Sequence, residues 1–207
     1  MKSLKGTQTH INLMKSFAGE SQARNRYTFY AEAAQKQGYP LIQKLFEDIA
    51  AQEQMHAKVF YQHLLQEFNG QQLEIQADYP VDFYQEDTLE NLRASIAAEK
   101  HEHKEVYPAF AEVARNEGFP KIAAHFEMIG NIEDEHSRKF IDIATQLEEK
   151  TLFKKADPIA WECQVCGHIH FGVSAPTLCV VCQHPKGHFQ EVKLSAAVMK
   201  KLKSNAK

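Results

Sequence analysis

Two Glu-x-x-His motifs, 80 residues apart, are the residues of this chain best suited to chemistry: Glu53 with His56, and Glu133 with His136. Because residues i and i+3 lie on one face of a helix, each motif can direct a carboxylate oxygen and an imidazole nitrogen toward the same pair of metals. A helical bundle that holds metals in this way also needs one carboxylate from each of its two other helices. The motifs therefore predict a two-metal site.

Two further glutamates meet that need, because Glu20 and Glu99 stand 33 and 34 residues before the glutamates of the motifs. Burying such carboxylates without cations would cost on the order of several kcal/mol each, whereas two metal ions neutralise them. Glu102 follows Glu99 by one helical turn, where the first helix has only Ala23 or Arg24. This asymmetry predicts two unequal metal positions.

All four cysteines fall in two Cys-x-x-Cys pairs, Cys163 with Cys166 and Cys179 with Cys182, separated by twelve residues. Four thiolates at this spacing are typical of a tetrahedral site for zinc or for a single iron ion. Taken alone, the pattern leaves both metals open. Zinc cannot pass electrons, so a two-metal site in the same chain favours iron.

The two motifs lie in segments that repeat each other. When residues 30–60 are aligned with residues 110–140, twelve of the thirty-one positions are identical. Apolar residues at helical spacing predict four helices, at about 9–37, 41–68, 87–116 and 121–150. The stretch 71–86 is long enough to cross the length of a bundle, and four long helices with one such crossover predict a ferritin-like fold.

The two halves differ in register by a single residue. Ten steps lead from Glu20 to the repeat at Tyr30, but eleven lead from Glu99 to Phe110. A π-turn accommodates one extra residue in a helix, and such turns favour functional sites. We expect one at about residues 102–108, where a proline also disturbs the helical hydrogen bonds.

Length and charge narrow the classes of function. The 207 residues have room for one domain of about 150 residues and a small appendage. The net charge of −3 does not indicate nucleic-acid binding, and we interpret five lysines near the carboxyl end as a solvated basic tail. They are Lys193, Lys200, Lys201, Lys203 and Lys207. Neither a signal peptide nor an apolar membrane span is recognisable, so we expect a cytoplasmic protein without membrane contact.

Several features together closely resemble the rubrerythrin family: the stretch SFAGESQARNRYTFYAEAA, the run AAEKHEHKEVYP, both Glu-x-x-His motifs and the four-cysteine module. The resemblance covers roughly residues 10–192. It implies an all-α ferritin-like four-helix bundle in residues 1–152. It also implies a small rubredoxin-like four-cysteine metal-binding domain with short β-strands in residues 153–207.

The same resemblance implies an enzyme, a non-haem di-iron peroxidase that reduces hydrogen peroxide to water. Two iron ions would lie in the bundle and one in the four-cysteine site. The implied ligands are Glu20, Glu53, His56, Glu99, Glu102, Glu133 and His136 in the bundle, and Cys163, Cys166, Cys179 and Cys182 in the appendage. A homodimer or higher oligomer would pass electrons head to tail between subunits. The electrons would come from an external rubredoxin or NAD(P)H reductase.

Four residues need comment beside the ligands. In the family one iron exchanges a glutamate for a histidine on reduction, and the matching residues are Glu102 and His56; this exchange would keep a buried site near neutrality. Tyr27 and Tyr107 match aromatic positions near the family's site, where they either hydrogen-bond to a ligand or fill the core. Where the family commonly has glycine after the second cysteine pair, this chain has a glutamine. Gln183 either adopts a left-handed backbone or the turn differs.

Two other functions remain open. Ferritin-like bundles with Glu-x-x-His motifs also occur in iron-storage proteins, so a ferroxidase or iron-binding protein is the main alternative to a peroxidase. The appended cysteine module and Glu102 argue against it. A zinc-binding module without turnover is the third reading. No glycine-rich nucleotide loop is recognisable, so the reductant is expected to be a separate protein.

Overall fold

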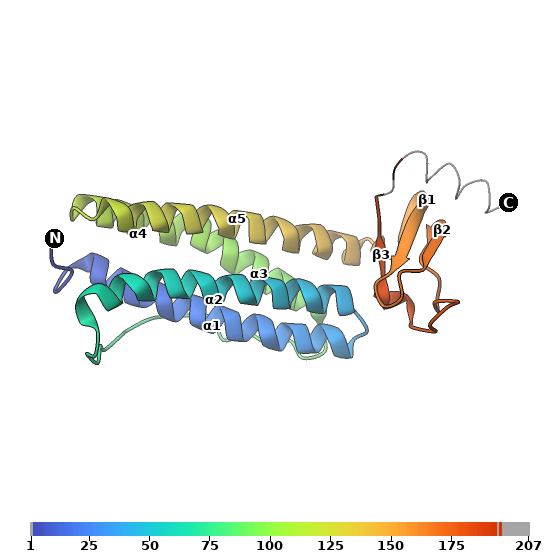
Figure 1. Cartoon of the computed structure of the whole chain (residues 1–207), viewed down its shortest axis with the longest axis horizontal. Coiled ribbons are helices and arrows are strands. Elements are labelled where there is room, and N and C mark those ends of the chain that lie inside the picture. Colours follow the sequence, from blue (N-terminus) through green and yellow to red (C-terminus); the bar gives the residue numbers. More distant parts are fainter. Residues whose placement is uncertain (1, 194, 196–207) are drawn as a thin grey trace.

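The computed structural model describes residues 2–193 and 195, and most of this part of the chain is a bundle of long antiparallel helices (Figure 1). Its segments are α1 (Gln8–Lys36), α2 (Pro40–Phe68), α3 (Thr88–His101), the π-helical segment η1 (Glu102–Val106), α4 (Tyr107–Asn116) and α5 (Pro120–Glu148). Because α3, η1 and α4 follow one another without a break, they act as a single rod. The predicted all-α four-helix bundle is thus confirmed.

The duplication is visible in the turns that join the paired helices. Gly38 and Gly118 have φ values of 80° and 83°, a left-handed conformation that glycine adopts without strain. Pro40 and Pro120 then begin α2 and α5, where the missing amide hydrogen costs no helical hydrogen bond. Each half is therefore a helical hairpin closed by the same turn.

The connection between α2 and α3 runs along the bundle beside α1 (Figure 1). Its described residues 71–87 form no helix or strand, as expected for the crossover. Asp82 fixes it to α1: its carboxylate lies 3.2 Å from Arg26 Nη1, and Tyr30 donates its hydroxyl to the same carboxylate at 2.6 Å. This anchor determines where the crossover passes.

Two apolar clusters fill the bundle, one toward each end. One includes Leu13, Phe60 and Phe126, and the other includes Phe46 and Phe140, all fully buried. Along α1, α2 and α5 the glutamates and histidines of the predicted site stand between these clusters. A layer of buried charge is therefore enclosed between two apolar layers, which exclude water from it.

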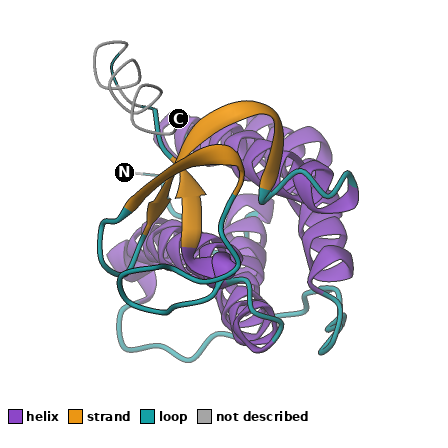
Figure 2. Ribbon diagram, turned by 90° about the vertical axis from the view of Figure 1, so that its right-hand side faces the viewer, coloured by secondary structure: helices purple, strands orange, loops and turns teal. Residues whose placement is uncertain are grey.

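The chain ends in a small antiparallel sheet with strand order β2-β1-β3 at one end of the bundle (Figures 1 and 2). Its elements are β1 (Lys154–Cys163), β2 (Ile169–Ser174), the 3-10 turn η2 (Lys186–His188) and β3 (Phe189–Glu191). Trp161 and Phe189 are fully buried beside Cys163 and Cys179. These short strands around four cysteines confirm the predicted appendage.

The sheet domain packs against the turn between α1 and α2. Phe153 stacks on Tyr39 with ring centroids 6.4 Å apart and planes 2° from parallel. Gly187 lies so close to the backbone of Gly38 that a Cβ atom would overlap the carbonyl oxygen. Within the same chain, the two domains are therefore in direct contact.

Two sequence expectations concern parts of the molecule outside this core. Of the predicted basic tail, only Lys193 belongs to the described residues; Lys200, Lys201, Lys203 and Lys207 lie outside them. In the described part of the chain, no helix combines the length and the apolar character that crossing a membrane requires.

Candidate metal centres

Six acidic and histidine side chains from α1, α2, α3 and α5 meet in the buried layer of the bundle. They form two overlapping sets in which the potential ligand atoms lie within 4.8 Å of one another. The sets are Glu20, Glu53, His56 and Glu133, and Glu53, Glu99, Glu133 and His136. Glu53 and Glu133 belong to both, so the arrangement suits two neighbouring cations bridged by two carboxylates.

The spacing within each motif explains the geometry. His56 Nδ1 lies 2.8 Å from Glu53 Oε2, and His136 Nδ1 lies 2.9 Å from Glu133 Oε2, as expected for i, i+3 neighbours on a helix. Each histidine also reaches the other motif: His56 Nδ1 is 3.1 Å from Glu133 Oε1, and His136 Nδ1 is 3.0 Å from Glu53 Oε1. Each imidazole nitrogen thus faces both shared carboxylates.

Two tyrosines connect the halves of the bundle crosswise. Tyr27 on α1 donates its hydroxyl to Glu99 on α3, and Tyr107 on α4 donates its hydroxyl to Glu20 on α1. Both tyrosines are buried, and burial raises the pKa of each phenol, followed by the charge of Glu99 for Tyr27 and of Glu20 for Tyr107. They therefore remain protonated donors that orient the two outer carboxylates.

Several polar atoms of the cluster make no hydrogen bond to any described residue, although they are buried. They are Glu20 Oε2, Glu53 Oε1, Glu99 Oε2, both carboxylate oxygens of Glu133, and His136 Nδ1. His136 Nδ1 lies near three carboxylates, but without hydrogen-bond geometry. Buried polar groups are nearly always satisfied. Two cations among these atoms would satisfy them, so the donor set fits a pair of metal ions, and carboxylate with imidazole is a set that suits iron.

Without cations, the carboxylates crowd their negative charges. Burial raises the pKa of Glu99 to about 8, and the charge of Glu53 adds to the effect. Burial also raises the pKa of Glu20, with further contributions from Glu133 and Glu53. Burial alone would lower the pKa of His136, but its contacts with Glu133 and Glu53 outweigh burial and raise that pKa to about 12. The cluster therefore attracts positive charge, whether protons or metal ions.

Glu102 differs from the other predicted ligands in its position. It is the first residue of η1, is only partly buried, and belongs to neither ligand set. Burial raises the pKa of its carboxyl group, and the charge of Glu99 raises it further. The π-helix itself lies at the predicted residues, so that expectation is confirmed. Glu102 faces a cavity of about 540 Å³ beside the cluster.

Sequence reasoning missed one contact of the site. Gln52 Oε1 lies 2.7 Å from His136 Nε2, the ring nitrogen that points away from the carboxylates. A partner on the second nitrogen fixes the orientation of a metal-binding histidine and its tautomer. The repeat contained a signal for it, because Gln52 aligns with Ile132 and thus breaks the symmetry next to a motif glutamate.

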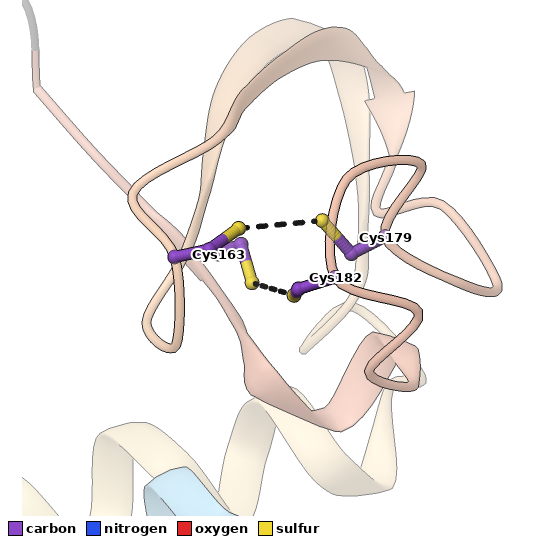
Figure 3. A group of neighbouring side chains, drawn as sticks. Cys163, Cys179 and Cys182 are labelled. Atoms are coloured by element: carbon purple, nitrogen blue, oxygen red, sulfur yellow. Dashed lines mark hydrogen bonds between the residues drawn. The ribbon is translucent and has the colours of Figure 1, made fainter.

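The four cysteines converge from two loops of the sheet domain, and Figure 3 shows Cys163 facing Cys179 and Cys182. The distance from Cys163 Sγ to Cys182 Sγ is 3.6 Å, as is that from Cys166 Sγ to Cys179 Sγ. A disulfide requires about 2.05 Å. Sulfurs at tetrahedral corners, each about 2.3 Å from one ion, lie about 3.8 Å apart. The geometry therefore fits one tetrahedral metal ion.

The two cysteine loops have the same backbone design. The amide of Cys163 donates to the carbonyl of His168, and the amide of Cys179 donates to the carbonyl of His184, both at 2.8 Å. The residue after each pair is left-handed, with φ of 75° at Gly167 and 60° at Gln183. Of the two alternatives for Gln183, the structure has the left-handed backbone.

Of the two thiols of the second loop, that of Cys179 has a lowered pKa, whereas the pKa of Cys182 is raised. Burial raises the pKa of Cys179, but the amides of Cys182 and Val181 outweigh burial and lower it to about 7. Since the thiolate is the form that binds metals, this sulfur binds a cation readily at neutral pH.

Comparison with known proteins agrees with both centres. The profile of the family described as rubrerythrin matches residues 12–144, and that of the rubrerythrin rubredoxin-like domain matches residues 161–190. The rubrerythrin of Clostridium perfringens is 46% identical over 193 residues, which cover 93% of this chain and 98% of that protein. The rubrerythrin of Porphyromonas gingivalis is 44% identical over 192 residues, covering 93% and 94%.

Solved structures show the same likeness. The structure of nigerythrin in its fully reduced, all-ferrous state superposes with a TM-score of 0.61. It is 28% identical and covers 92% of each chain. The bacterioferritin of Mycobacterium tuberculosis, at 16% identity and a TM-score of 0.56, shares the fold over 72% of this chain.

Proposed function

This chain belongs to the rubrerythrin family of oxidoreductases, and from that premise we propose that it reduces hydrogen peroxide to water at a di-iron site in its bundle. The observation that carries the proposal is the pair of overlapping ligand sets, with buried carboxylate oxygens that lack any partner among the described residues. The fully reduced nigerythrin holds ferrous iron, which supports iron as the metal in this chain.

The proposed iron ligands are the seven side chains named from the sequence: Glu20, Glu53, His56, Glu99, Glu102, Glu133 and His136. Two ferrous ions in this place would supply both electrons that the reduction of one peroxide requires, and would act as Lewis acids on its oxygens. Glu53 and Glu133 are the shared carboxylates and set the spacing of the pair. Two protons from solvent complete the conversion of hydrogen peroxide into two water molecules.

Four other side chains hold this arrangement in place. Tyr27 and Tyr107 orient the carboxylates of Glu99 and Glu20, and Gln52 orients the ring of His136. The apolar clusters on both sides exclude water, which strengthens each of these electrostatic contacts. The carboxylates of Glu20 and Glu99 and the ring of His136, held in this way, need little rearrangement when the charge on the metals changes.

We also propose that Glu102 and His56 are alternative ligands of one iron. His56 lies within a ligand set and Glu102 lies in neither, which supports an exchange between them. A carboxylate at the edge of the cluster on a π-helical segment can leave the metal by moving into the adjoining cavity, where water can solvate it. The neutral imidazole would then replace one negative charge when the metals have gained electrons.

The four cysteines are proposed to hold a third iron that relays electrons to the bundle of another copy. Within one chain this domain touches the turn at Gly38, eighteen residues along α1 from Glu20 and therefore about 27 Å from it. Electron tunnelling weakens exponentially with distance, so this separation disfavours transfer within one chain. We therefore propose a homodimer or higher oligomer with head-to-tail transfer.

Three further parts of the proposal follow from the family. An external rubredoxin or NAD(P)H reductase would supply the electrons, and the protein would act in the cytoplasm. The division between the domains is proposed at residues 152 and 153, just before β1 begins at Lys154.

One experiment tests the function directly. The iron-loaded protein is reduced without oxygen and titrated with hydrogen peroxide, while the absorption of the ferric-thiolate centre is followed. We expect rapid return of that colour and one peroxide consumed for every two electrons. A ferroxidase would instead consume dioxygen, retain ferric iron and assemble into a shell. Stable reduced spectra after peroxide addition would refute the proposed peroxidase.

A further inference from the structure

A cavity of about 540 Å³ lies between α1 and the rod formed by α3 and η1, with the crossover passing over it. Ser16, Gly19 and Arg26 line it from α1, Glu102 and Tyr107 from the opposite rod, and Asp82 from the crossover. A water molecule occupies about 30 Å³ in the liquid, and hydrogen peroxide is only slightly larger. The cavity can therefore hold several such molecules.

Two residues that line this cavity each have a buried polar atom without a partner in the described part of the chain. The atoms are Ser16 Oγ, on a residue 4% exposed, and Arg26 Nε, on a residue 7% exposed. Such groups are rare unless a water or a ligand satisfies them. A hydroxyl both donates and accepts a hydrogen bond, and the guanidinium nitrogen donates. Together they suit a small molecule that can also donate and accept.

The cavity reaches the carboxylate cluster at its inner side. Glu102 and Tyr107 belong to its wall, and Tyr107 donates its hydroxyl to Glu20. The outer wall is fixed because Arg26 Nη1 and the hydroxyl of Tyr30 both bind the carboxylate of Asp82. The same arginine therefore holds the crossover through one nitrogen, while its Nε has no partner among the described residues.

We propose that this cavity is the entry chamber through which hydrogen peroxide reaches the cluster, with Ser16 Oγ and Arg26 Nε as the groups that bind it on the way. The inference rests on the proposed peroxidase function and adds to it a binding site outside the ligand sets. Hydrogen peroxide matches the site because it is small, neutral, and both a donor and an acceptor.

Gly19 provides a way to close the chamber without damaging the fold. A Cβ atom at this position would meet no heavy atom of the described residues within 4 Å, and Gly19 lines the cavity. Replacing glycine inside a helix also removes an entropic penalty of roughly 1 kcal/mol. Gly19→Leu should therefore fold at least as well as the wild type while its side chain fills the chamber. Gly19→Ala is the matched control, with the same helical gain and little added volume.

The kinetic test compares Gly19→Leu, Gly19→Ala and wild type, each loaded with iron to the same content. We expect kcat/KM for hydrogen peroxide to fall about tenfold in Gly19→Leu, which corresponds to roughly 1.4 kcal/mol, with kcat unchanged because only access is impaired. Gly19→Ala should match the wild type. If the wild type turns over peroxide and Gly19→Leu keeps its kcat/KM, the entry chamber is refuted. No turnover by the wild type would instead refute the proposed function.

A second measurement does not depend on turnover. Ser16→Cys places a thiol in the chamber of the metal-loaded protein, and methyl methanethiosulfonate is the small probe. We expect modification of the peptide that contains residue 16, and at least about tenfold slower modification when Gly19→Leu is added, as for an entry barrier of that size. Equal rates in both backgrounds, or no modification at all, would contradict an open chamber at Ser16.

Discussion

The first and third rods of the bundle supply equivalent residues, but only one of them is a regular helix. In α1, Tyr27 stands seven positions after Glu20; in the rod formed by α3, η1 and α4, Tyr107 stands eight positions after Glu99. Yet each tyrosine donates to the glutamate of the opposite rod. The π-helical segment absorbs the extra residue, so that a symmetric pair of contacts survives an asymmetric insertion.

The π-helical insertion explains how a symmetric cluster of side chains acquires two unequal metal positions. A π-turn widens the rod and adds Glu102 beside the cluster, where α1 has no carboxylate. The cavity lies between the two rods at this point, with Arg26 on the regular side and Glu102 on the widened side. Both halves hold proposed metal ligands, but one side alone carries the additional acid.

Removing the extra residue of the π-helical segment should have the largest effect on iron binding. Deleting Lys104, which is exposed on η1, would turn the residues on either side by about 100° relative to each other. Glu99 and Tyr107 could then no longer both face the cluster. We expect the deletion variant to lose the bundle irons, measured as iron per chain, and with them peroxide turnover. Lys104→Ala is the control and should retain both; a deletion variant with full iron content would show that the π-turn is dispensable.

The acid that breaks the symmetry can be removed separately. Glu102→Gln preserves shape but removes the charge, and we expect peroxide turnover to fall about 10- to 100-fold, as for other changes around metal ligands. The iron content should remain close to that of the wild type. Glu105→Gln, on the same segment but exposed, should change neither quantity. Wild-type turnover in Glu102→Gln would remove this residue from the proposed ligand exchange.

The two tyrosines should contribute equally to the free energy of unfolding if the rods are equivalent at these positions. Tyr27→Phe and Tyr107→Phe each leave a buried carboxylate without its donor, which we expect to cost about 1 to 2 kcal/mol of unfolding free energy. Urea unfolding of the metal-free protein measures both. Each phenylalanine variant keeps the ring, so packing is preserved. A cost confined to one variant would show that the crosswise pairs are unequal.

The cysteine loops offer a second, smaller comparison of the same kind. Gly167 and Gln183 share a left-handed backbone, which costs a residue with a side chain about 1 to 2 kcal/mol. Gln183→Gly should therefore stabilise the sheet domain by about 1 kcal/mol, and Gly167→Gln should destabilise it by a similar amount. Thermal unfolding followed by fluorescence of Trp161, the only tryptophan of the chain, measures this domain selectively. Destabilisation by Gln183→Gly, or stabilisation by Gly167→Gln, would mean that backbone strain is not the deciding factor.

The smallest expected effect concerns the amino-terminal segment. It donates hydrogen bonds to a glutamate of each half of the bundle, Glu67 on α2 and Glu117 at the end of α4. Hydrogen bonds from Ser3 and then from the Leu4 amide lower the pKa of Glu67. Burial raises the pKa of Glu117, but bonds from Thr9 outweigh it, so the net shift is downward. Groups with a lowered pKa stabilise the fold above their unfolded pKa, and this contribution is lost as pH falls through the folded value.

We therefore expect acid to release this segment before the bundle unfolds, below about pH 4.3, the ordinary pKa of a glutamate. Glu117→Gln should flatten the pH dependence of stability between neutral and acidic pH, measured by urea unfolding at several pH values. Glu127→Gln, an exposed carboxylate on α5, is the control and should leave that dependence intact. An identical pH profile in Glu117→Gln and wild type would contradict the assignment.

Much of the fold was predictable because its determinants are local in sequence. Helical periodicity and the repeat predicted the four rods, and a single-residue offset between Glu20 and Glu99 predicted the π-turn. The cysteine spacing predicted the sheet domain. Such signals depend only on residues within one element or on exact repetition, so no knowledge of packing is required.

The remaining features depend on how the helices are rotated against one another. The crosswise donation by Tyr27 and Tyr107, the contact of Gln52 with His136, and the cavity at Ser16 join residues on different rods. The hydrogen-bonded pair of His63 and His125, whose ring nitrogens lie 2.7 Å apart, belongs to the same class. Sequence separation carries no information about such rotations, and only packing decides them.

The contact between Gly187 and Gly38 has a consequence for movement. It leaves no space for even a methyl group, and stacking of Phe153 on Tyr39 braces it from the side. The sheet domain is therefore packed firmly against the helical bundle rather than joined to it by a flexible linker. In the proposed oligomer, the distance from its sulfurs to the carboxylates of a neighbouring copy would be set by the way whole chains assemble, so mutations at a subunit boundary should control the rate of the proposed electron transfer.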